Sequence, residues 1–313
     1  MEFSEIAQVA MSKVLGSADN ANLRHFWLYV LCGMAIAVFA HRIGGDDRKF
    51  HAVFFRKEVW QSRSAFIDYT ILILNPVIFV FAIDWVLKTL WNLIPLISDG
   101  VRSLGADLST ESGSVWVAVA LTVTLYLVND FMRWWLHYLQ HKVPLLWEFH
   151  KIHHSAEHLN FATAERFHPL DTVFFSVGSI SAAAIVNGAF IGLFGDQLTV
   201  YQLGGANIIF FGTNLIGGVL RHSPAWVSFG PKIEKWLISP AMHQIHHSSD
   251  PKHWDKNMGG GLAIWDRMGG TLYVPEGREE LQFGIGEESE DYRTLYGVYV
   301  EPLIKASRIV QRG

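Results

Sequence analysis

Five long apolar stretches constrain the fold of this chain more than any other feature. They run through residues 26–40, 67–97, 115–136, 172–194 and 198–220. A helix needs about 20 residues to cross the ~30 Å hydrocarbon core of a bilayer. Only 17% of the 313 residues are charged, against about 25% in a typical soluble domain. The sequence therefore predicts an all-α membrane protein with about four to five transmembrane helices.

Two of these stretches raise questions of topology. Residues 67–97 would form a helix of roughly 46 Å, longer than one straight span needs, and Asn75-Pro76 interrupts it. We expect either one tilted, kinked helix or a span followed by an interfacial helix. Residues 172–194 and 198–220 are separated by only three residues, which predicts a tight hairpin of two spans.

Loop charge predicts the orientation of the spans. Residues 41–64 carry six Lys and Arg residues, whereas residues 98–114 carry one. Basic loops remain in the cytoplasm, so we place residues 41–64 inside. Alternation of the helices then places every histidine cluster on the cytoplasmic side, within a helical cap of a multi-pass protein. The net charge of −4 and the single Cys32 argue against nucleic acid as a partner, a disulfide framework and a thiolate metal site.

Histidine spacing is the strongest chemical signal. The chain has 15 histidines, and eight of them form an HxxxH pair and two HxxHH triplets: His137, His141; His150, His153, His154; His243, His246, His247. HxxHH would occur by chance roughly 0.03 times in such a chain. Residues i, i+3 and i+4 share a helix face. We therefore expect each triplet to aim three imidazoles at one point.

So many imidazoles indicate bound cations. Buried neutral imidazoles need partners, and imidazole is a ligand for Fe, Zn, Cu and Ni. Because one ion takes about four to six ligands, the set indicates two ions. Nearby carboxylates are expected to offset their charge and to fix the imidazole tautomers: Glu148, Glu157, Glu165, Asp171, Asp255 and Asp266. At a membrane boundary, this combination favours oxidation of a lipid C–H bond with O2.

Residues 130–275 resemble the fatty acid hydroxylase / sterol desaturase superfamily of integral-membrane, non-haem di-iron enzymes. The resemblance rests on the order HxxxH, HxxHH, HxxHH, and on Arg166-Phe-His168-Pro169, Arg221-His222-Ser223-Pro224 and Trp265-Asp266-Arg267. Asp255-Lys-Asn257-Met-Gly259 is similar to the family's D-x-N-x-G. The chain would then divide into an N-terminal transmembrane region (1–129), a catalytic region (130–275, with the hairpin 172–220) and a cytoplasmic tail (276–313).

The resemblance implies the site residues. The family's metal ligands correspond to His137, His141, His150, His153, His154, His222, His243, His246 and His247, with His168 as a tenth candidate. We expect a second layer around them from Asp171, Asp255, Asn257, Asp266 and Asn214. Three of the remaining histidines belong to no motif: His25, His41 and His51. The other two, His158 and His253, could lie either beside the ligands or in solvent.

The resemblance also implies a reaction and its partners. Two Fe ions and O2 would hydroxylate or desaturate a fatty acyl chain, a sterol or a related lipid drawn from the bilayer. Zn can replace Fe at such sites in purified protein. Electrons would come from a separate donor of the cytochrome b5 or ferredoxin type with its reductase.

Other interpretations stay open from the sequence. A bis-His haem membrane redox protein needs histidine pairs within facing spans, whereas these triplets follow the spans. A zinc-binding transporter or hydrolase is the third class, although the chain has no HExxH. Four tryptophans fit either an acyl tunnel or an aromatic belt at the membrane boundary: Trp134, Trp135, Trp147 and Trp254.

Overall fold

Helices dominate the computed structural model, which describes residues 21–22, 26–44, 48–105, 108–109 and 113–311, except the side chains of residues 80–88. The α-helices are α2 (Trp27–Ile43), α3 (Phe50–Phe54), α4 (Lys57–Trp60), α5 (Arg63–Trp91), α6 (Leu93–Ser103), α7 (Val115–Lys142), α8 (Pro144–His154), α9 (Pro169–Phe194), α10 (Ile208–Leu215), α11 (Pro240–His246), α12 (Ile264–Gly269), α13 (Leu295–Tyr299) and α14 (Glu301–Val310). Shorter 3-10 helices are η2 (Phe161–Glu165), η3 (Gly218–His222), η4 (Pro251–His253) and η5 (Gly286–Arg293). Two strands, β1 (Gln202–Leu203) and β2 (Ala206–Asn207), pair antiparallel.

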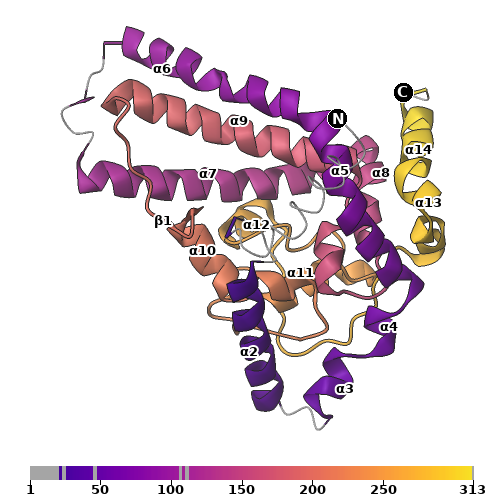
Figure 1. Cartoon of the computed structure of the whole chain (residues 1–313). Helices are drawn as coiled ribbons and strands as arrows, with labels where there is room; N and C mark the ends of the chain where they lie inside the picture. The colour runs from indigo at the N-terminus through magenta and orange to yellow at the C-terminus, as the bar shows by residue number, and fades with distance from the viewer. Residues whose placement is uncertain (1–20, 23–25, 45–47, 106–107, 110–112, 312–313) are drawn as a thin grey trace.

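Three long segments lie side by side: α6, α9 and α7 (Figure 1). Among the described residues, α7 and α9 are long and apolar enough to cross a membrane, whereas α2, with 17 residues, is apolar but shorter. The expected stretch 67–97 divides between α5 and α6 at Asn92. The mostly helical architecture is therefore as predicted, while α7 and α9 are the spans that meet both criteria.

Glycines allow α9 to approach its neighbour closely. A Cβ atom added at Gly188 would lie 2.8 Å from Ile97 Cβ, and one at Gly192 would lie 2.6 Å from Val101 Cβ. Because both neighbours belong to α6, any larger residue would force the two helices apart. This is the packing by small residues that helices in lipid favour.

The expected hairpin of two full spans over 172–220 is wrong. After α9 ends at Phe194, the chain forms the β1–β2 hairpin, the eight-residue α10 and then η3. Eight residues make about 12 Å of helix, too short to cross a bilayer. Gly204 and Gly205 have positive φ angles of 60° and 81°, and Gly217 has a φ of 139°. These conformations interrupt an apolar sequence that otherwise reads as one helix.

The helix α2 runs across α7 and α9 rather than alongside them (Figure 1). It packs on η3 and α10. Tyr29, Gly33 and Ala37 form its buried stripe, spaced four residues apart. Its opposite face exposes large apolar side chains, including Leu31 and Phe39.

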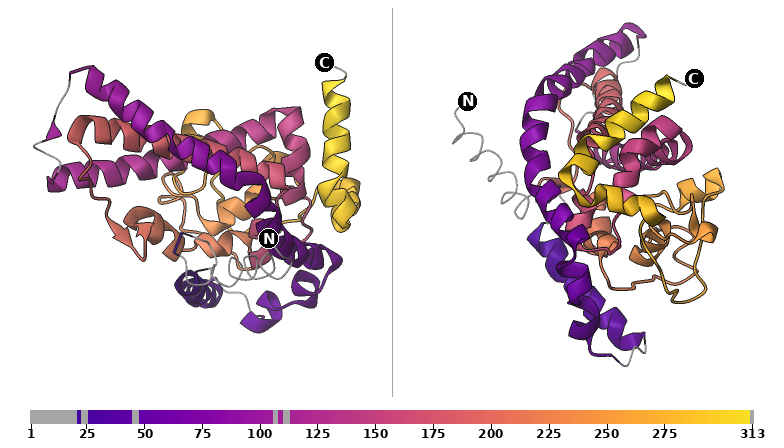
Figure 2. Two further views of the ribbon diagram at one scale, coloured as in Figure 1. Left: turned by 45° about the horizontal axis from the view of Figure 1, so that its top comes forward. Right: turned by 90° about the vertical axis from the view of Figure 1, so that its right-hand side faces the viewer.

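Three helices near the histidines, α8, α9 and α11, begin in the same way. Pro144, Pro169 and Pro240 each occupy the first turn of α8, α9 and α11, where a missing N–H costs nothing. The helix α8 follows α7 after Val143 alone, so the end of α7 lies close to α8. The C-terminal α14 covers α8 from outside, as the end-on view in Figure 2 shows.

Candidate metal centre

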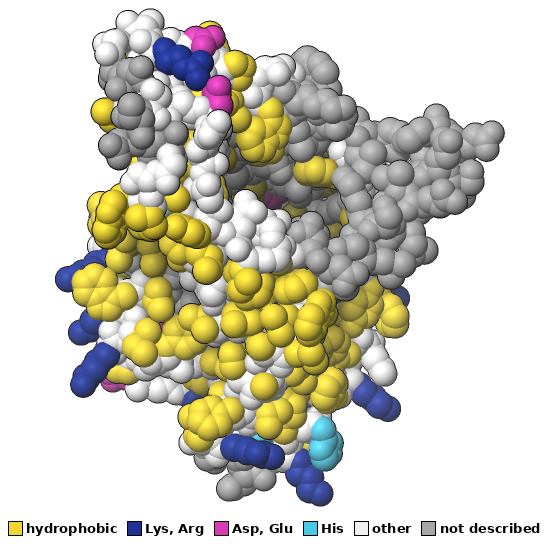
Figure 3. Space-filling view, turned by 60° about the vertical axis from the view of Figure 1, so that its left-hand side comes forward, with side chains coloured by type: hydrophobic (Ala, Val, Ile, Leu, Met, Phe, Trp, Pro, Cys, Tyr) yellow, Lys and Arg dark blue, Asp and Glu magenta, His cyan; other side chains and the backbone are white. Residues whose placement is uncertain are grey.

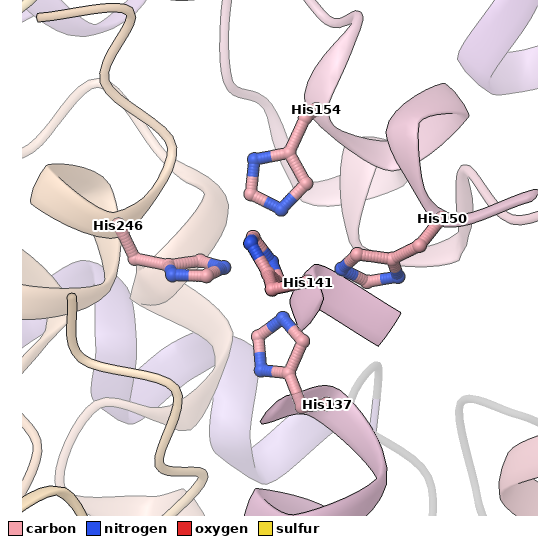
Figure 4. A group of neighbouring side chains, drawn as sticks. All are labelled: His137, His141, His150, His154 and His246. Carbon is pink, nitrogen blue, oxygen red and sulfur yellow. The ribbon is translucent and has the colours of Figure 1, made fainter. Parts of the chain in front are cut away.

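Five histidines form the first group, which we call the five-histidine group: His137, His141, His150, His154 and His246. They come from α7, α8 and α11, and one nitrogen of each lies within 4.8 Å of the others. Their rings converge on one point (Figure 4). All five Nε2 atoms are buried and have no hydrogen-bond partner among the described residues.

The second group, the four-histidine group, contains His153, His222, His243 and His247. The Nε2 atom of His222 lies 3.1 Å from those of His153 and His247 and 3.0 Å from that of His243. The two groups are adjacent, since the ring centroids of His154 and His247 are 4.6 Å apart. Together they contain nine of the ten ligand candidates.

The expectation that each triplet aims at one point is wrong. In α8, His150 and His154 join the five-histidine group and His153 joins the other; in α11, His243 and His247 lie together and His246 is separate. On a helix, residues i and i+4 are about 40° apart, whereas neighbours in sequence differ by about 100°. Each HxxHH triplet therefore contributes to both groups.

Protein oxygens hold the Nδ1 side of the five-histidine group. His137 Nδ1 lies 2.7 Å from the Met258 carbonyl oxygen, and His246 Nδ1 lies 2.7 Å from that of Lys256. His150 Nδ1 is 3.1 Å from Asp171, and His141 Nδ1 is 3.4 Å from Asp255. A hydrogen on Nδ1 leaves the Nε2 lone pair free for a ligand bond. Asp171 and Asp255 thus lie where the sequence predicts, while the two carbonyl partners belong to the backbone and leave no sequence signal.

The donor set fits metal ions. Burial lowers the pKa of His246 to about 3, and that of His153, His154, His243 and His247 well below the usual value. These imidazoles are therefore neutral donors at pH 7. A ring nitrogen is one donor or one acceptor, so three contacts near 3 Å at a single His222 nitrogen cannot all be hydrogen bonds. Nitrogen ligands ~2.1 Å from one ion and at right angles lie about 3 Å apart.

Asp266 and Asn257 support the loop that holds His137. Asp266 accepts hydrogen bonds from the Met258 and Gly259 N–H groups at 2.8 and 2.7 Å, and from Trp134 and Thr271 side chains. Asn257, whose φ is 54°, donates to the Met242 carbonyl oxygen. These hydrogen bonds join backbone groups and the Trp134 and Thr271 side chains rather than an imidazole.

Other candidates lie outside both groups. His168 caps α9, where its Nδ1 accepts the Leu170 N–H at 3.1 Å, and its Nε2 lies 3.3 Å from the Tyr299 carbonyl oxygen. His253 pairs with Glu279 at 3.1 Å. Asn214 donates to the Phe210 carbonyl oxygen within its own helix. Two carboxylates expected near the metals pair elsewhere, Glu148 with Lys151 and Glu157 with Arg293.

A buried ion pair braces the end of α8, and its acidic partner carries no signal in the sequence. The guanidinium of Arg166 contacts Asp68 Oδ1 at 2.8 Å, and both side chains are fully buried. The same guanidinium donates to the carbonyl oxygens of Ile152 and Tyr292, at 3.0 and 3.2 Å. Ile152 precedes His153 in α8. The Arg166–Asp68 pair therefore links α5, α8 and the C-terminal segment that contains Tyr292.

A cavity of about 970 Å³ adjoins both groups, and its walls include His137 and His150 from one and His153, His222 and His243 from the other. The four tryptophans considered for an acyl tunnel do not line it. Trp134 instead bonds Asp266, and Trp254 is 62% exposed. The aromatic residues that do line the cavity include Trp91 and Phe175.

Residues 122–271 match the family model described as fatty acid hydroxylase. This segment is therefore similar to the fatty acid hydroxylase family, as the sequence resemblance implied. The match contains all nine histidines of the two groups as well as Asp171, Asp255, Asn257 and Asp266. Proteins of this family are membrane-bound, in keeping with the apolar α7 and α9.

Relatives of this chain act on different lipids. An alkylglycerol monooxygenase from Xenopus tropicalis is 26% identical over 227 residues, 65% of this chain and 47% of the relative. An ornithine lipid hydroxylase from Rhizobium tropici is 29% identical over 54% of this chain and 47% of the relative. A Delta(7)-sterol 5(6)-desaturase from Aspergillus fumigatus is 29% identical over 51% of each chain. The chain therefore spans about half the length of these relatives. No solved structure matches it significantly.

Proposed function

We propose that this protein is an O2-dependent membrane lipid oxidoreductase, a hydroxylase or desaturase that acts on a C–H bond of a fatty acyl chain, a sterol or a related lipid. One observation carries the proposal: two adjacent groups of neutral, inward-facing imidazoles open onto one large cavity. The similarity to alkylglycerol monooxygenase, ornithine lipid hydroxylase and sterol desaturase supports the same class.

Each group would hold one iron ion through its Nε2 atoms. Bound iron would supply the activation of O2 that an unreactive C–H bond requires. The chain supplies the rest: Asp171, Asp255 and two backbone carbonyls fix the tautomers of the five-histidine group, and burial excludes water. Groups of five and four convergent imidazoles exceed the two axial ligands of a haem, which favours ions over the haem alternative.

Both candidate reactions need two electrons and two protons from outside. Hydroxylation would place one atom of O2 in the lipid and release one water; desaturation would remove two hydrogens and release two waters. A separate cytochrome b5 or ferredoxin with its reductase would supply the electrons. We also propose a multi-pass chain with the histidines on the cytoplasmic side. Because residues 198–220 do not form a span, this orientation depends on the basic loop 41–64 and on the gathering of the histidines at one site.

The molecular surface supports a membrane location. One face carries a broad band of hydrophobic side chains with Lys and Arg side chains around its edges (Figure 3). Exposed apolar residues include Leu31, Phe39, Trp116 and Ile185. Such an edge of basic residues fits the headgroup region of a bilayer. Reporter fusions at the C-terminus test the predicted cytoplasmic side, since alkaline phosphatase would be inactive there and a fluorescent protein would fluoresce.

Lipid profiling of cells with and without the chain tests the activity. We expect a lipid that gains one oxygen or loses two hydrogens, only under O2, in cells with the wild-type chain but not with the His246→Ala variant. Elemental analysis of the purified protein should give two metal ions per chain. A Soret band, or lipid changes that persist without O2, would contradict the proposal.

A further inference from the structure

Trp147 packs against the five-histidine group from outside the cavity. The centroid of its ring system lies 5.1 Å from that of His141, 5.5 Å from that of His154 and 6.3 Å from that of His150. In α8, residues 147, 150 and 154 share one face, because they are three and seven positions apart. Of the group, His137 and His150 line the cavity, whereas His141 and His154 do not. The group therefore has a second side, and Trp147 lies on it.

The indole of Trp147 also reaches the surface. Its side chain is partly exposed, and its N–H makes no hydrogen bond with the described residues. The indoles of Trp134 and Trp254, by contrast, donate to Asp266 and to the Ser249 carbonyl oxygen. Tryptophan suits a boundary at which its body packs on other rings and its N–H meets water or a partner. One aromatic system therefore extends from the surface to three candidate metal ligands.

The surface beside His141 is polar. Lys142, the next residue, forms an ion pair with Asp255, and the two side chains are 42% and 39% exposed. Asp255 also lies 3.4 Å from His141 Nδ1. Charged side chains avoid the hydrocarbon of a bilayer, so this surface faces water. The cavity, in contrast, is lined by residues of the apolar helices α7 and α9. A protein in the aqueous phase can thus approach Trp147 without passing through the cavity.

We propose, on the basis of the proposed function, that electrons enter this protein at Trp147. A carrier protein with a haem or an iron–sulfur cluster contacts the indole, and each encounter moves one electron through it to the five-histidine group. The carrier is oxidised by one electron and a ferric ion held there is reduced to ferrous, with no bond broken and no proton transferred. Two encounters supply the two electrons that hydroxylation or desaturation takes up. Because electron transfer slows steeply with distance, an aromatic ring that spans the gap is the favoured route.

One entry point serves both groups. His154, which contacts Trp147, stacks on His247 of the four-histidine group, with ring centroids 4.6 Å apart and an angle of 24° between the planes. The second electron therefore has a route of contacting rings to the other ion. Entry at Trp147 also keeps the carrier apart from O2 and the lipid, which would use the cavity.

Anaerobic stopped-flow mixing tests this route. The full-length, iron-loaded ferric protein in phosphatidylcholine nanodiscs, without added substrate, is mixed with either reduced cytochrome b5 or reduced ferredoxin. Absorbance follows the oxidation of the carrier. We expect the wild-type protein to oxidise at least one carrier, and Trp147→Leu to do so about tenfold more slowly or worse. Trp147→Phe keeps a smaller aromatic ring and should retain part of the rate. The carrier that reacts faster identifies haem or iron–sulfur as the class of donor.

Two controls separate electron entry from packing. Trp254→Leu is the matched variant, because Trp254 is 62% exposed and has no ring contact with either group among the described residues; its rate should equal that of the wild-type protein. Dithionite, which is small enough to use the cavity, should reduce the wild-type protein and Trp147→Leu equally fast. Iron content should also be the same in both.

Three outcomes would overturn the proposal. The first is a Trp147→Leu variant that oxidises the carriers as fast as the wild-type protein. The second is a variant that is slowed equally with dithionite or has lost iron, since Trp147 would then only pack against the ligands. The third is a wild-type protein that dithionite reduces and neither carrier does.

The proposed function fails separately from this inference. Absence of bound metal and of O2-dependent turnover in the wild-type protein would reject the oxidoreductase. Conversely, an active, iron-loaded wild-type protein whose Trp147→Leu variant accepts electrons from the carrier at the full rate would reject entry at Trp147 alone.

Discussion

The two histidine groups face one cavity but are held in different ways. Four rings of the five-histidine group direct Nδ1 at a protein oxygen: His137, His141, His150 and His246. In the four-histidine group, three buried Nδ1 atoms have no hydrogen-bond partner among the described residues: those of His153, His243 and His247. Partners behind a ligand change metal affinity by about 10–100-fold. The five-histidine group is thus prearranged for its ion, and the four-histidine group is less constrained.

The two groups differ in their Nδ1 partners because different parts of the chain surround them. The five-histidine group lies against the loop 255–259 and the start of α9, which supply backbone carbonyls and carboxylates. The four-histidine group lies between α8, η3 and α11, and Phe167 stacks on His153 at 4.3 Å between ring centroids. An aromatic face offers no acceptor of comparable strength, so these rings are positioned mainly by packing.

Removing one ligand from either group should have the largest effect. We expect His246→Ala and His153→Ala each to abolish lipid oxidation and to lose about one metal ion per chain, because no nearby side chain replaces the imidazole. Lipid product and metal content are measured together, with membrane insertion checked by fractionation. His51→Ala, on an exposed face of α3, is the control. Full activity in either ligand variant would show that the ring is not needed.

A chelator should distinguish the two groups. Because three rings of the four-histidine group, those of His153, His243 and His247, have no Nδ1 partner among the described residues, this group should release its ion at about 10–100-fold lower chelator concentration. Metal content followed during titration should therefore pause near one ion per chain. Repeating the titration in His243→Ala should remove the early step. Simultaneous loss of both ions from the wild-type protein would end the proposed distinction.

The variant Asp171→Asn should lower the metal affinity of the five-histidine group about tenfold. The Asp171 carboxylate lies 3.1 Å from His150 Nδ1 and also accepts from Gln140. An amide in its place can present N–H to the ring and favour the wrong tautomer. Asp196→Asn, at an exposed surface pair, is the matched control. Metal affinity that matches the control would mean that packing alone orients His150.

The sequence predicted the composition of the site better than its geometry. Spacing identified the HxxxH pair and both triplets, and the resemblance added His222, because ligand chemistry requires those residue types. It did not predict how the triplets divide between two groups, since that depends on how α8 and α11 face each other. Nor did it indicate Asp68 or the carbonyl oxygens of Met258 and Lys256, whose roles arise from tertiary contacts or backbone.

Prediction of the fold from the sequence was limited in the same way, because tertiary and backbone geometry is not written in residue type. The apolar runs predicted α7 and α9 because their length alone requires burial or lipid. The stretch 198–220 is equally apolar, yet glycines at 204, 205 and 217 take positive φ angles and turn it into a strand hairpin, α10 and η3. Hydropathy does not register backbone conformation, so a short helix beside the cavity and a membrane span look alike in the sequence.

Asp266→Asn should produce the smallest effect, since Asp266 acts on His137 through the loop. Its two carboxylate oxygens accept the Met258 and Gly259 N–H groups. Asparagine keeps only one of these acceptors, and its NH2 group would face the other N–H donor. We expect a loss of ~1–3 kcal/mol in the free energy of unfolding, seen as a lower melting temperature. Metal should leave the five-histidine group more readily, by less than in Asp171→Asn. A metal affinity reduced as much as in Asp171→Asn would instead show that the loop, more than the carboxylate beside His150, arranges this group.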